Sequence, residues 1–273
     1  MGGSVALATR NAINNCLITG YDISGVVGRW ALRRRIIDRV ADDPAAAVRD
    51  ADLVVLATPL SDAIELVRQI SGHLPAHALV TDVCSTKASI SQAARQNLTR
   101  PGRFVGSHPM AGSQYKGLKH ADGTIFRQSL CILTPLPGTP SSTTAGIAGF
   151  WRRLGMTTLA VPPSRHDRLV ALASHLPQVA ASALMAAQSE ESLRVAGPGL
   201  RDTTRLAASP GELWAGILLD NQRPVRSAIR ALRARLDAID RAVARGDRRA
   251  IERLFATASA NRSRLEHARG GKA

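Results

Sequence analysis

The stretch Leu53-Val54-Val55-Leu56-Ala57 decides the fold class of this chain, because it is a short and uninterrupted apolar run. Such a run is typical of a strand that is buried on both faces, as in a parallel sheet covered by helices. Further β-like runs occupy residues 16–21, 78–81 and 130–133, and the helix-like segments between them are 44–50, 61–70 and 87–96. Strands that alternate with helices predict an α/β domain with a doubly wound parallel sheet.

The character of the chain changes after Pro162-Pro163. Before that point, residues 135–144 are rich in Pro, Gly, Ser and Thr and predict a surface loop, and residues 157–161 predict one more strand. Beyond it no β-like run occurs, and leucine and alanine recur at helical spacing. We therefore predict an α/β domain over residues 1–162 and an all-helical domain over residues 163–273.

One helical stripe in the second domain consists of Leu232, Leu236, Ile239 and Val243, with arginines on the opposite face. Packing within the chain would explain such a stripe, and so would an interface with a second copy. A helical region of this size beside an α/β domain often supplies a dimer interface. We therefore expect a homodimer formed through the helical domain.

The composition excludes several classes of protein. The net charge of +15 comes mostly from scattered arginines, and aromatic residues make up only 3%, so a basic surface interleaved with stacking residues is absent. We expect no nucleic-acid partner.

No apolar run reaches the roughly 18 residues of a membrane span, and no secretory pattern precedes the fold, so we expect no membrane association. Cys16, Cys84 and Cys131 form neither a close pair nor a metal-binding spacing, which indicates reduced thiols in the cytoplasm and no metal site.

The first residues resemble the end of a dinucleotide-binding loop of the Rossmann type. Gly2 matches the third glycine of G-x-G-x-x-G, and Gly3 and Ser4 open the helix whose N–H groups would face a pyrophosphate. Asp22 follows 20 residues after Gly2, the spacing at which an acid accepts hydrogen bonds from the adenosine ribose. A carboxylate there would repel a 2′-phosphate, so the sequence favours NAD over NADP. Thr58 and Pro59, directly after their strand, should border the same cofactor.

This glycine motif is incomplete, and by itself it fits an ordinary capped helix equally well. Our hypothesis is that residue 1 is an internal methionine, with the first strand and the start of the glycine loop lying upstream of it. If the chain functions without them, we expect weak binding of NAD.

Five segments carry side chains suited to chemistry. They are residues 81–87, GSHPMAG at 106–112, SHLPQ at 174–178, GLRDTTR at 199–205, and Trp214. The first two should follow strands at the carboxyl side of the sheet, where ligands bind in such folds. His108, in a Gly/Pro loop, is suited to proton transfer because the pKa of histidine lies near the working pH. A lone histidine of this kind is just as compatible with a structural role.

Together, and in this order, these segments resemble the prephenate/arogenate dehydrogenase family over essentially the whole chain. Members pass a hydride from ring C4 of a cyclohexadienol to NAD(P)⁺ while a carboxylate leaves as CO₂. The resemblance implies that His108 is the base that takes the proton of the 4-hydroxyl and that Ser85 bonds the same hydroxyl. It also implies that Arg205 binds a substrate carboxylate. Ser85 could instead cap a helix, and Arg205 could instead pair with Asp202.

The same resemblance places Ser174 and His175 in the cleft between the domains, with Ser174 near the cofactor and His175 near the substrate. Trp214 would form a wall of the substrate pocket. The chain departs from many relatives in having Gln178 where they carry a second histidine. Cys84 stands where glycine is usual, which would add strain if that backbone needs positive φ.

A second departure bears on the substrate. Gln114, after Ser113, stands where relatives often carry glutamate. Gln178, Ser113 and Gln114 should all lie near the substrate side chain. A neutral Gln114 lacks a charge for the ammonium group of arogenate, which favours prephenate.

We therefore predict the NAD-dependent oxidative decarboxylation of prephenate to 4-hydroxyphenylpyruvate, in tyrosine biosynthesis. The alternatives are an arogenate dehydrogenase and a catalytically impaired dimeric remnant. A β-hydroxyacid dehydrogenase is disfavoured, because it needs a helical lysine and the second domain has only Lys272.

Overall fold

The computed structural model describes residues 1–112 and 117–270, with the backbone alone for 268–270. The chain divides into two compact units, Met1–Gln222 and Arg223–Ala273. The domain boundary that we predicted between residues 162 and 163 separates an α/β domain from an all-helical domain. The division into compact units does not test it, so it stays a prediction.

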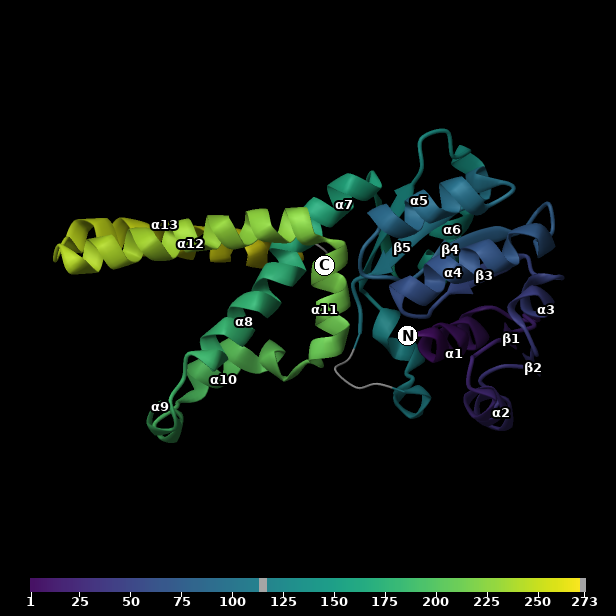
Figure 1. The fold of residues 1–273 in the computed structure, drawn as a ribbon, viewed down its shortest axis with the longest axis horizontal. Coiled ribbons are helices and arrows are strands. Elements are labelled where there is room, and N and C mark those ends of the chain that lie inside the picture. Colours follow the sequence, from purple (N-terminus) through teal and green to yellow (C-terminus); the bar gives the residue numbers. More distant parts are fainter. Residues whose placement is uncertain (113–116, 271–273) are drawn as a thin grey trace. The chain divides into compact units, whose positions relative to one another are not determined.

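The first unit begins with alternating helices and parallel strands (Figure 1). Its elements are α1 (Gly2–Ala12), β1 (Thr19–Gly20), α2 (Gly25–Arg33), β2 (Arg39–Val40), α3 (Pro44–Val48), β3 (Leu53–Leu56), α4 (Leu60–Ile70), β4 (Leu79–Asp82) and α5 (Ala88–Asn97). Strand β1 pairs in parallel with β2, and β3 pairs in parallel with β4. The predicted alternation is confirmed, although the strand expected over residues 16–21 is only two residues long.

Strand β3 is less buried than its apolar sequence predicts. Leu56 is buried, whereas Leu53, Val54 and Val55 are half-buried. The reason is that β3 is hydrogen-bonded to β4 along one edge, while β1–β2 and β3–β4 form separate sheets among the described residues. The expectation of a further strand upstream stays a prediction.

The last strands of the first unit are β5 (Val105–Pro109), β6 (Leu130–Pro135) and β7 (Thr157–Ala160). Strands β6 and β7 are parallel, but β5 and β6 are antiparallel, which the sequence did not predict. Between β5 and β6, the described residues 110–112 and 117–129 include no crossover helix and contain the short 3-10 helices η3 (Leu118–His120) and η4 (Gly123–Phe126), so the chain folds back beside β5. His108 therefore lies within a strand and not in the predicted loop.

Helices cover both faces of the strands β3 to β7, which form two sheets, β3–β4 and β5–β6–β7, joined by an isolated parallel bridge between Val80 and Phe104. Helix α6 (Ser141–Arg153) buries Trp151 against Phe126 and Leu133 on one face, and it begins inside the loop that we predicted over 135–144. Helices α4 and α5 pack Val67 and Ile90 over the other face. This two-sided cover is the doubly wound arrangement.

The rest of the first unit is helical, as predicted. One continuous helical segment, Pro163–Ala186, comprises α7 (Pro163–Val170), a π-helical turn (Ala171–His175) and α8 (Leu176–Ala186). It is followed by α9 (Glu190–Arg194), α10 (Pro198–Thr204), the 3-10 helix η6 (Arg205–Ala208) and α11 (Gly211–Asp220). By length and composition alone, Pro163–Ala186 is the one segment of the described residues that could cross a membrane. Core helices of soluble proteins meet the same criterion, and α8 packs against α10 and η6.

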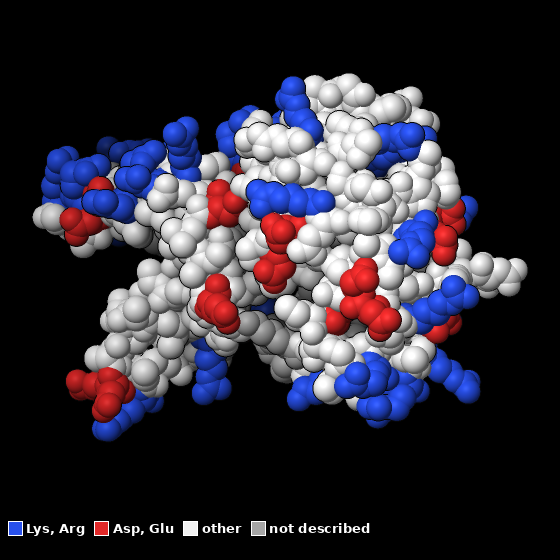
Figure 2. All heavy atoms as spheres, turned by 45° about the vertical axis from the view of Figure 1, so that its right-hand side comes forward, with Lys and Arg blue, Asp and Glu red and all other residues white. Residues whose placement is uncertain are grey.

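The second unit is formed by two long helices, α12 (Gln222–Ala244) and α13 (Arg248–Gly270). Gly246, at φ +62°, makes the turn between them. Of the predicted apolar stripe on α12, Leu236 and Val243 are more than half exposed, so packing within the chain does not account for them. Figure 2 shows lysine and arginine side chains spread over the visible face, with acidic side chains between them.

Candidate active site

A cavity of about 3350 Å³ lies in the first unit, beside the first turn of α1 and the carboxyl ends of β3 and β4. Every predicted site residue that the structure describes lines it: His108, Ser85, Arg205, His175, Gln178, Trp214, Gly2, Gly3, Ser4, Asp22, Thr58, Pro59 and Ser174. The predicted residues Ser113 and Gln114 lie outside the described residues. The fold thus brings together side chains from segments that lie far apart in the sequence.

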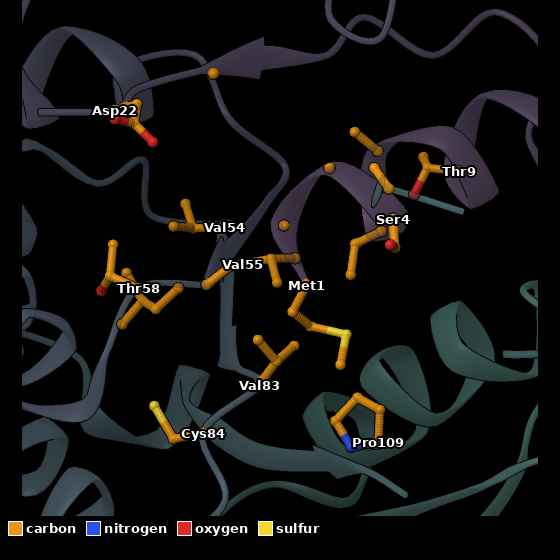
Figure 3. A pocket seen from close by; sticks show the side chains of 18 of the residues that line it. Met1, Ser4, Thr9, Asp22, Val54, Val55, Thr58, Val83, Cys84 and Pro109 are labelled. Carbon is orange, nitrogen blue, oxygen red and sulfur yellow. The ribbon is translucent and has the colours of Figure 1, made fainter. Parts of the chain in front are cut away.

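One part of the cavity is suited to a dinucleotide. The N-terminus of α1 has no side-chain cap and no acidic residue in its first turn, so its N–H groups remain available to an anion. The carboxylate of Asp22 is exposed; its Oδ1 accepts a hydrogen bond from the N–H of Ser24 at 2.8 Å, and its Oδ2 stays available for a hydroxyl. Figure 3 shows Met1 in the middle of this region, with Asp22 and Thr58 on one side of it and Pro109 on another.

Glycines allow close packing where α1 begins. A Cβ on Gly2 would lie 3.0 Å from the Cβ of Ala57, and one on Gly3 would overlap the side chain of Leu118. Both glycines therefore let α1 approach its neighbours closely. The hydroxyl of Ser4 bonds the protein itself: its Oγ accepts a hydrogen bond from the N–H of Asp122 at 3.1 Å.

His108 is buried near the end of β5 and bonded to a second histidine. Its Nδ1 lies 2.8 Å from Nε2 of His166, and Nδ1 of His166 lies 2.7 Å from Oδ1 of Asp167. Burial is the main reason why the pKa of His108 lies well below its ordinary value, and the electrostatic effect of neighbouring basic groups, His166 first, lowers it further. His108 is therefore neutral at neutral pH, as a general base must be.

Asp167 is held at the start of α5. It accepts hydrogen bonds from the N–H groups of Lys87 at 2.8 Å and of Ala88 at 2.9 Å. Burial by itself would raise the pKa of Asp167, but the hydrogen bond from His166 and these two backbone bonds outweigh it and hold the pKa below its usual value. Asp167 thus joins the histidine pair to the segment that carries Ser85.

A fully buried ion pair lies under this segment. Lys87 Nζ bonds Asp82 Oδ2, and both side chains have no exposed surface. Asp82 also accepts hydrogen bonds from the N–H groups of Cys84 and Ser107. The pair therefore ties the end of β4 to the residue before His108.

Ser85 is half-buried in the loop between β4 and α5. The N-cap of α5 is Lys87, and the first N–H groups of the helix are bonded by Asp167. The alternative role of Ser85 as a helix cap is therefore wrong. Thr58 has a buried hydroxyl without a hydrogen-bond partner among the described residues, which leaves it available to a ligand in the cavity.

The π-helical turn carries Ser174 and His175. Asn221 Nδ2 donates to the backbone oxygen of Asp167 at 2.8 Å and lies 3.2 Å from Nδ1 of His175. Because an amide nitrogen only donates, Nδ1 of His175 accepts and its Nε2 carries the proton. This Nε2–H is buried without a partner among the described residues, and burial lowers the pKa of His175 to about 4. Trp214 packs edge-on against the same ring, with 5.9 Å between ring centroids.

Arg205 is exposed at the start of η6 and forms no ion pair with Asp202 or with any other residue that the structure describes. The alternative role of Arg205 in a salt bridge is thus unsupported by the described contacts. Gln178 donates to the backbone oxygen of Leu206 at 2.9 Å, so it holds the segment that presents Arg205.

The sequence analysis missed His166, Asp167 and Asn221 as site residues. A His-Asp dipeptide soon after Pro162-Pro163 was a visible signal, but its relation to His108 depends on tertiary contacts alone. No group of three or more His, Cys, Asp or Glu side chains among the described residues could hold a metal ion.

The doubly wound sheet, the open N-terminus of α1 and the buried neutral histidine define the class of this protein as a nicotinamide-dependent oxidoreductase. A profile of the prephenate dehydrogenase nucleotide-binding domain matches residues 5–160, and one of the prephenate dehydrogenase dimerization domain matches residues 162–257. The chain belongs to the prephenate dehydrogenase family.

Individual relatives agree with this assignment. The prephenate dehydrogenase of Bacillus subtilis is 31% identical over 97% of this chain and 73% of its own length. The cyclohexadienyl dehydrogenase of Zymomonas mobilis is 33% identical over 81% of this chain and 78% of its own. The prephenate dehydrogenase of Aquifex aeolicus, solved in complex with hydroxyphenyl propionate and NAD⁺, is 28% identical. It superposes with a TM-score of 0.89, covering 97% of this chain and 94% of its own.

Proposed function

We propose that this protein catalyses the NAD-dependent oxidative decarboxylation of prephenate to 4-hydroxyphenylpyruvate. The observation that carries the proposal is that all described members of the predicted site line one cavity around a buried, neutral His108. The relatives named prephenate dehydrogenase support the choice of substrate and reaction.

The residues fit NAD at one part of the cavity. The N–H groups of α1 would bind the pyrophosphate, and Oδ2 of Asp22 would accept a hydrogen bond from the ribose. When bound, NAD⁺ accepts the hydride that leaves ring C4 of the substrate. A carboxylate at the position of Asp22 favours NAD over NADP by repelling a 2′-phosphate.

The side chains of this chain divide the remaining work. Nε2 of His108, the ring nitrogen that does not face His166, takes the proton of the 4-hydroxyl as the hydride leaves. Ser85 bonds the same hydroxyl and fixes its position. The guanidinium of Arg205 binds a carboxylate of the substrate. Loss of CO₂ then makes the ring aromatic, so the step is effectively irreversible.

Formation of NADH with prephenate and with arogenate is the direct test. We expect turnover of prephenate, and His108→Asn should lower kcat by roughly 10²–10⁴ with little change in the Kd of NAD⁺. An unchanged kcat in this variant would remove His108 from the role of base. No turnover of either substrate by the folded protein would favour the impaired remnant.

Arogenate is the second candidate substrate, because a carboxylate is available in the cavity. Asp220 lines it; Oδ1 of Asp220 accepts a hydrogen bond from Ser89, while its buried Oδ2 has no partner among the described residues. An ammonium group would suit this oxygen. A kcat/KM for arogenate above that for prephenate, lost selectively in Asp220→Asn, would favour this candidate.

We further propose that the protein is a cytoplasmic homodimer associated through its helical region. The profile match to a dimerization domain supports this, as do the exposed apolar side chains Leu169, Leu172 and Leu184 on the segment Pro163–Ala186. Leu172→Asp should weaken the dimer in light scattering coupled to size-exclusion chromatography. A monomeric wild-type protein would contradict this proposal.

A further inference from the structure

Three buried side chains form a continuous hydrogen-bonded chain that leads away from the cavity. His108 Nδ1 lies 2.8 Å from His166 Nε2, and His166 Nδ1 lies 2.7 Å from Asp167 Oδ1. The exposed fractions are 8% for His108, 0% for His166 and 4% for Asp167. Only His108 of the three lines the cavity, so the other two cannot contact a ligand there directly.

The hydrogen bonds determine where each proton lies. Asp167 accepts hydrogen bonds from two backbone N–H groups, so its carboxylate is an acceptor, and Nδ1 of His166 must carry the proton between them. When the histidine pair holds no extra proton, Nε2 of His166 has a lone pair. His108 must then donate its Nδ1–H to that lone pair, which leaves the lone pair of His108 on Nε2.

We propose that His166 and Asp167 hold the proton that His108 removes from the substrate. This inference rests on the proposed function. As the O–H bond of the 4-hydroxyl breaks and a bond to Nε2 of His108 forms, the proton on Nδ1 of His108 moves to Nε2 of His166. His108 ends neutral, and His166 ends as an imidazolium beside the Asp167 carboxylate. After product release, the reverse shift returns one proton to water through Nε2 of His108.

The surroundings favour a positive charge on His166 over one on His108. Among the described residues, the charged or titratable groups near His108 other than His166 are Lys87, which is paired with Asp82, the neutral His175, and Cys131 on the adjacent strand β6. None of these is an unpaired anion. His166, in contrast, contacts the carboxylate of Asp167 directly. Burial makes an imidazolium at His108 costly, and moving the charge by one hydrogen bond reduces that cost.

The tautomers can be measured without any substrate. In the full-length protein with ¹⁵N-labelled histidine, long-range ¹H–¹⁵N spectra at pH 8 should show His108 as the Nδ1–H tautomer and His166 as the same tautomer. His108→Gln and His166→Gln would assign the two rings. A proton on Nε2 of His108 under these conditions would overturn the proposal.

Kinetic measurements distinguish a His166 that takes up the proton from a His166 that only positions His108. In His166→Gln the amide oxygen can still accept the Nδ1–H of His108, but it cannot take the proton. We expect kcat to fall by roughly 10- to 100-fold with an unchanged KM for prephenate, and the acid limb of kcat/KM to move to lower pH because His108 must then hold the charge alone. The matched control is His73→Gln, an exposed histidine of η1 (Ser71–His73) outside the cavity, which should retain wild-type values.

The kinetic result for His166→Gln tests the proton relay, and the turnover of the wild-type protein tests the proposed function. An acid limb that is unchanged in His166→Gln, or that moves to higher pH, would show that His166 acts only as a neighbour and would overturn the relay. If wild-type protein oxidises neither prephenate nor arogenate, the proposed function fails, while the tautomer measurement still tests the hydrogen-bonded chain by itself.

Discussion

The buried ion pair between Lys87 and Asp82 should dominate the stability of the active-site region. The change to make is Lys87→Met, which keeps the length of the aliphatic chain and removes the charge. Both partners are fully buried, so the carboxylate of Asp82 would lose the one cationic partner that it has among the described residues without gaining water. Two backbone N–H groups would remain as its hydrogen-bond donors.

Removing one partner of a buried ion pair typically costs about 3–5 kcal/mol. That cost is a large part of the roughly 5–15 kcal/mol by which most domains are stable.

Urea unfolding followed by circular dichroism measures these differences in the free energy of unfolding. The double variant Asp82→Asn with Lys87→Met removes both charges and should recover more than half of the loss. Lys119→Met, on the exposed helix η3, is the matched control and should stay within about 0.5 kcal/mol of the wild type. A loss below about 1 kcal/mol for Lys87→Met would refute the argument.

Three further predictions follow from the site and its support. Arg205→Ala should raise the KM for prephenate roughly 10- to 100-fold, because a charge-assisted hydrogen bond is lost; an unchanged KM would place the carboxylate contact elsewhere. Gly123→Ala should cost about 1–3 kcal/mol in urea unfolding, because its Cβ would lie 2.7 Å from the backbone nitrogen of Ala8, whereas Gly149→Ala, in open space on α6, should not destabilise. Burial lowers the pKa of His175 from 6.5 to about 4. Between these pH values the histidine binds a proton in the unfolded chain but not in the folded protein. About 3 kcal/mol of the free energy of unfolding, present above pH 6.5, should therefore be lost on acidification to pH 4. His175→Gln should reduce that pH dependence, and an equal dependence in this variant would contradict the assignment.

The alternation of helices and parallel strands in the first half and the all-helical second half were predictable from the sequence. Apolar runs and helical spacing are local properties, so they predict elements well. The same holds for most of the described site residues, because their motifs stand at the ends of predicted elements. His108, Ser85, Asp22 and Arg205 all line the cavity that the fold creates.

Three features depend on tertiary contacts and could not be predicted from the sequence: the antiparallel return of β6 beside β5, the incomplete burial of β3, and the partners of His108. Strand pairing depends on which distant edge is available, and no local pattern records it. His166 and Asp167 read as ordinary residues near a helix start in the sequence. They become part of the site because α7 packs against α5 and β6, which brings His166 within hydrogen-bonding distance of His108 and Asp167 within that distance of the backbone of Lys87.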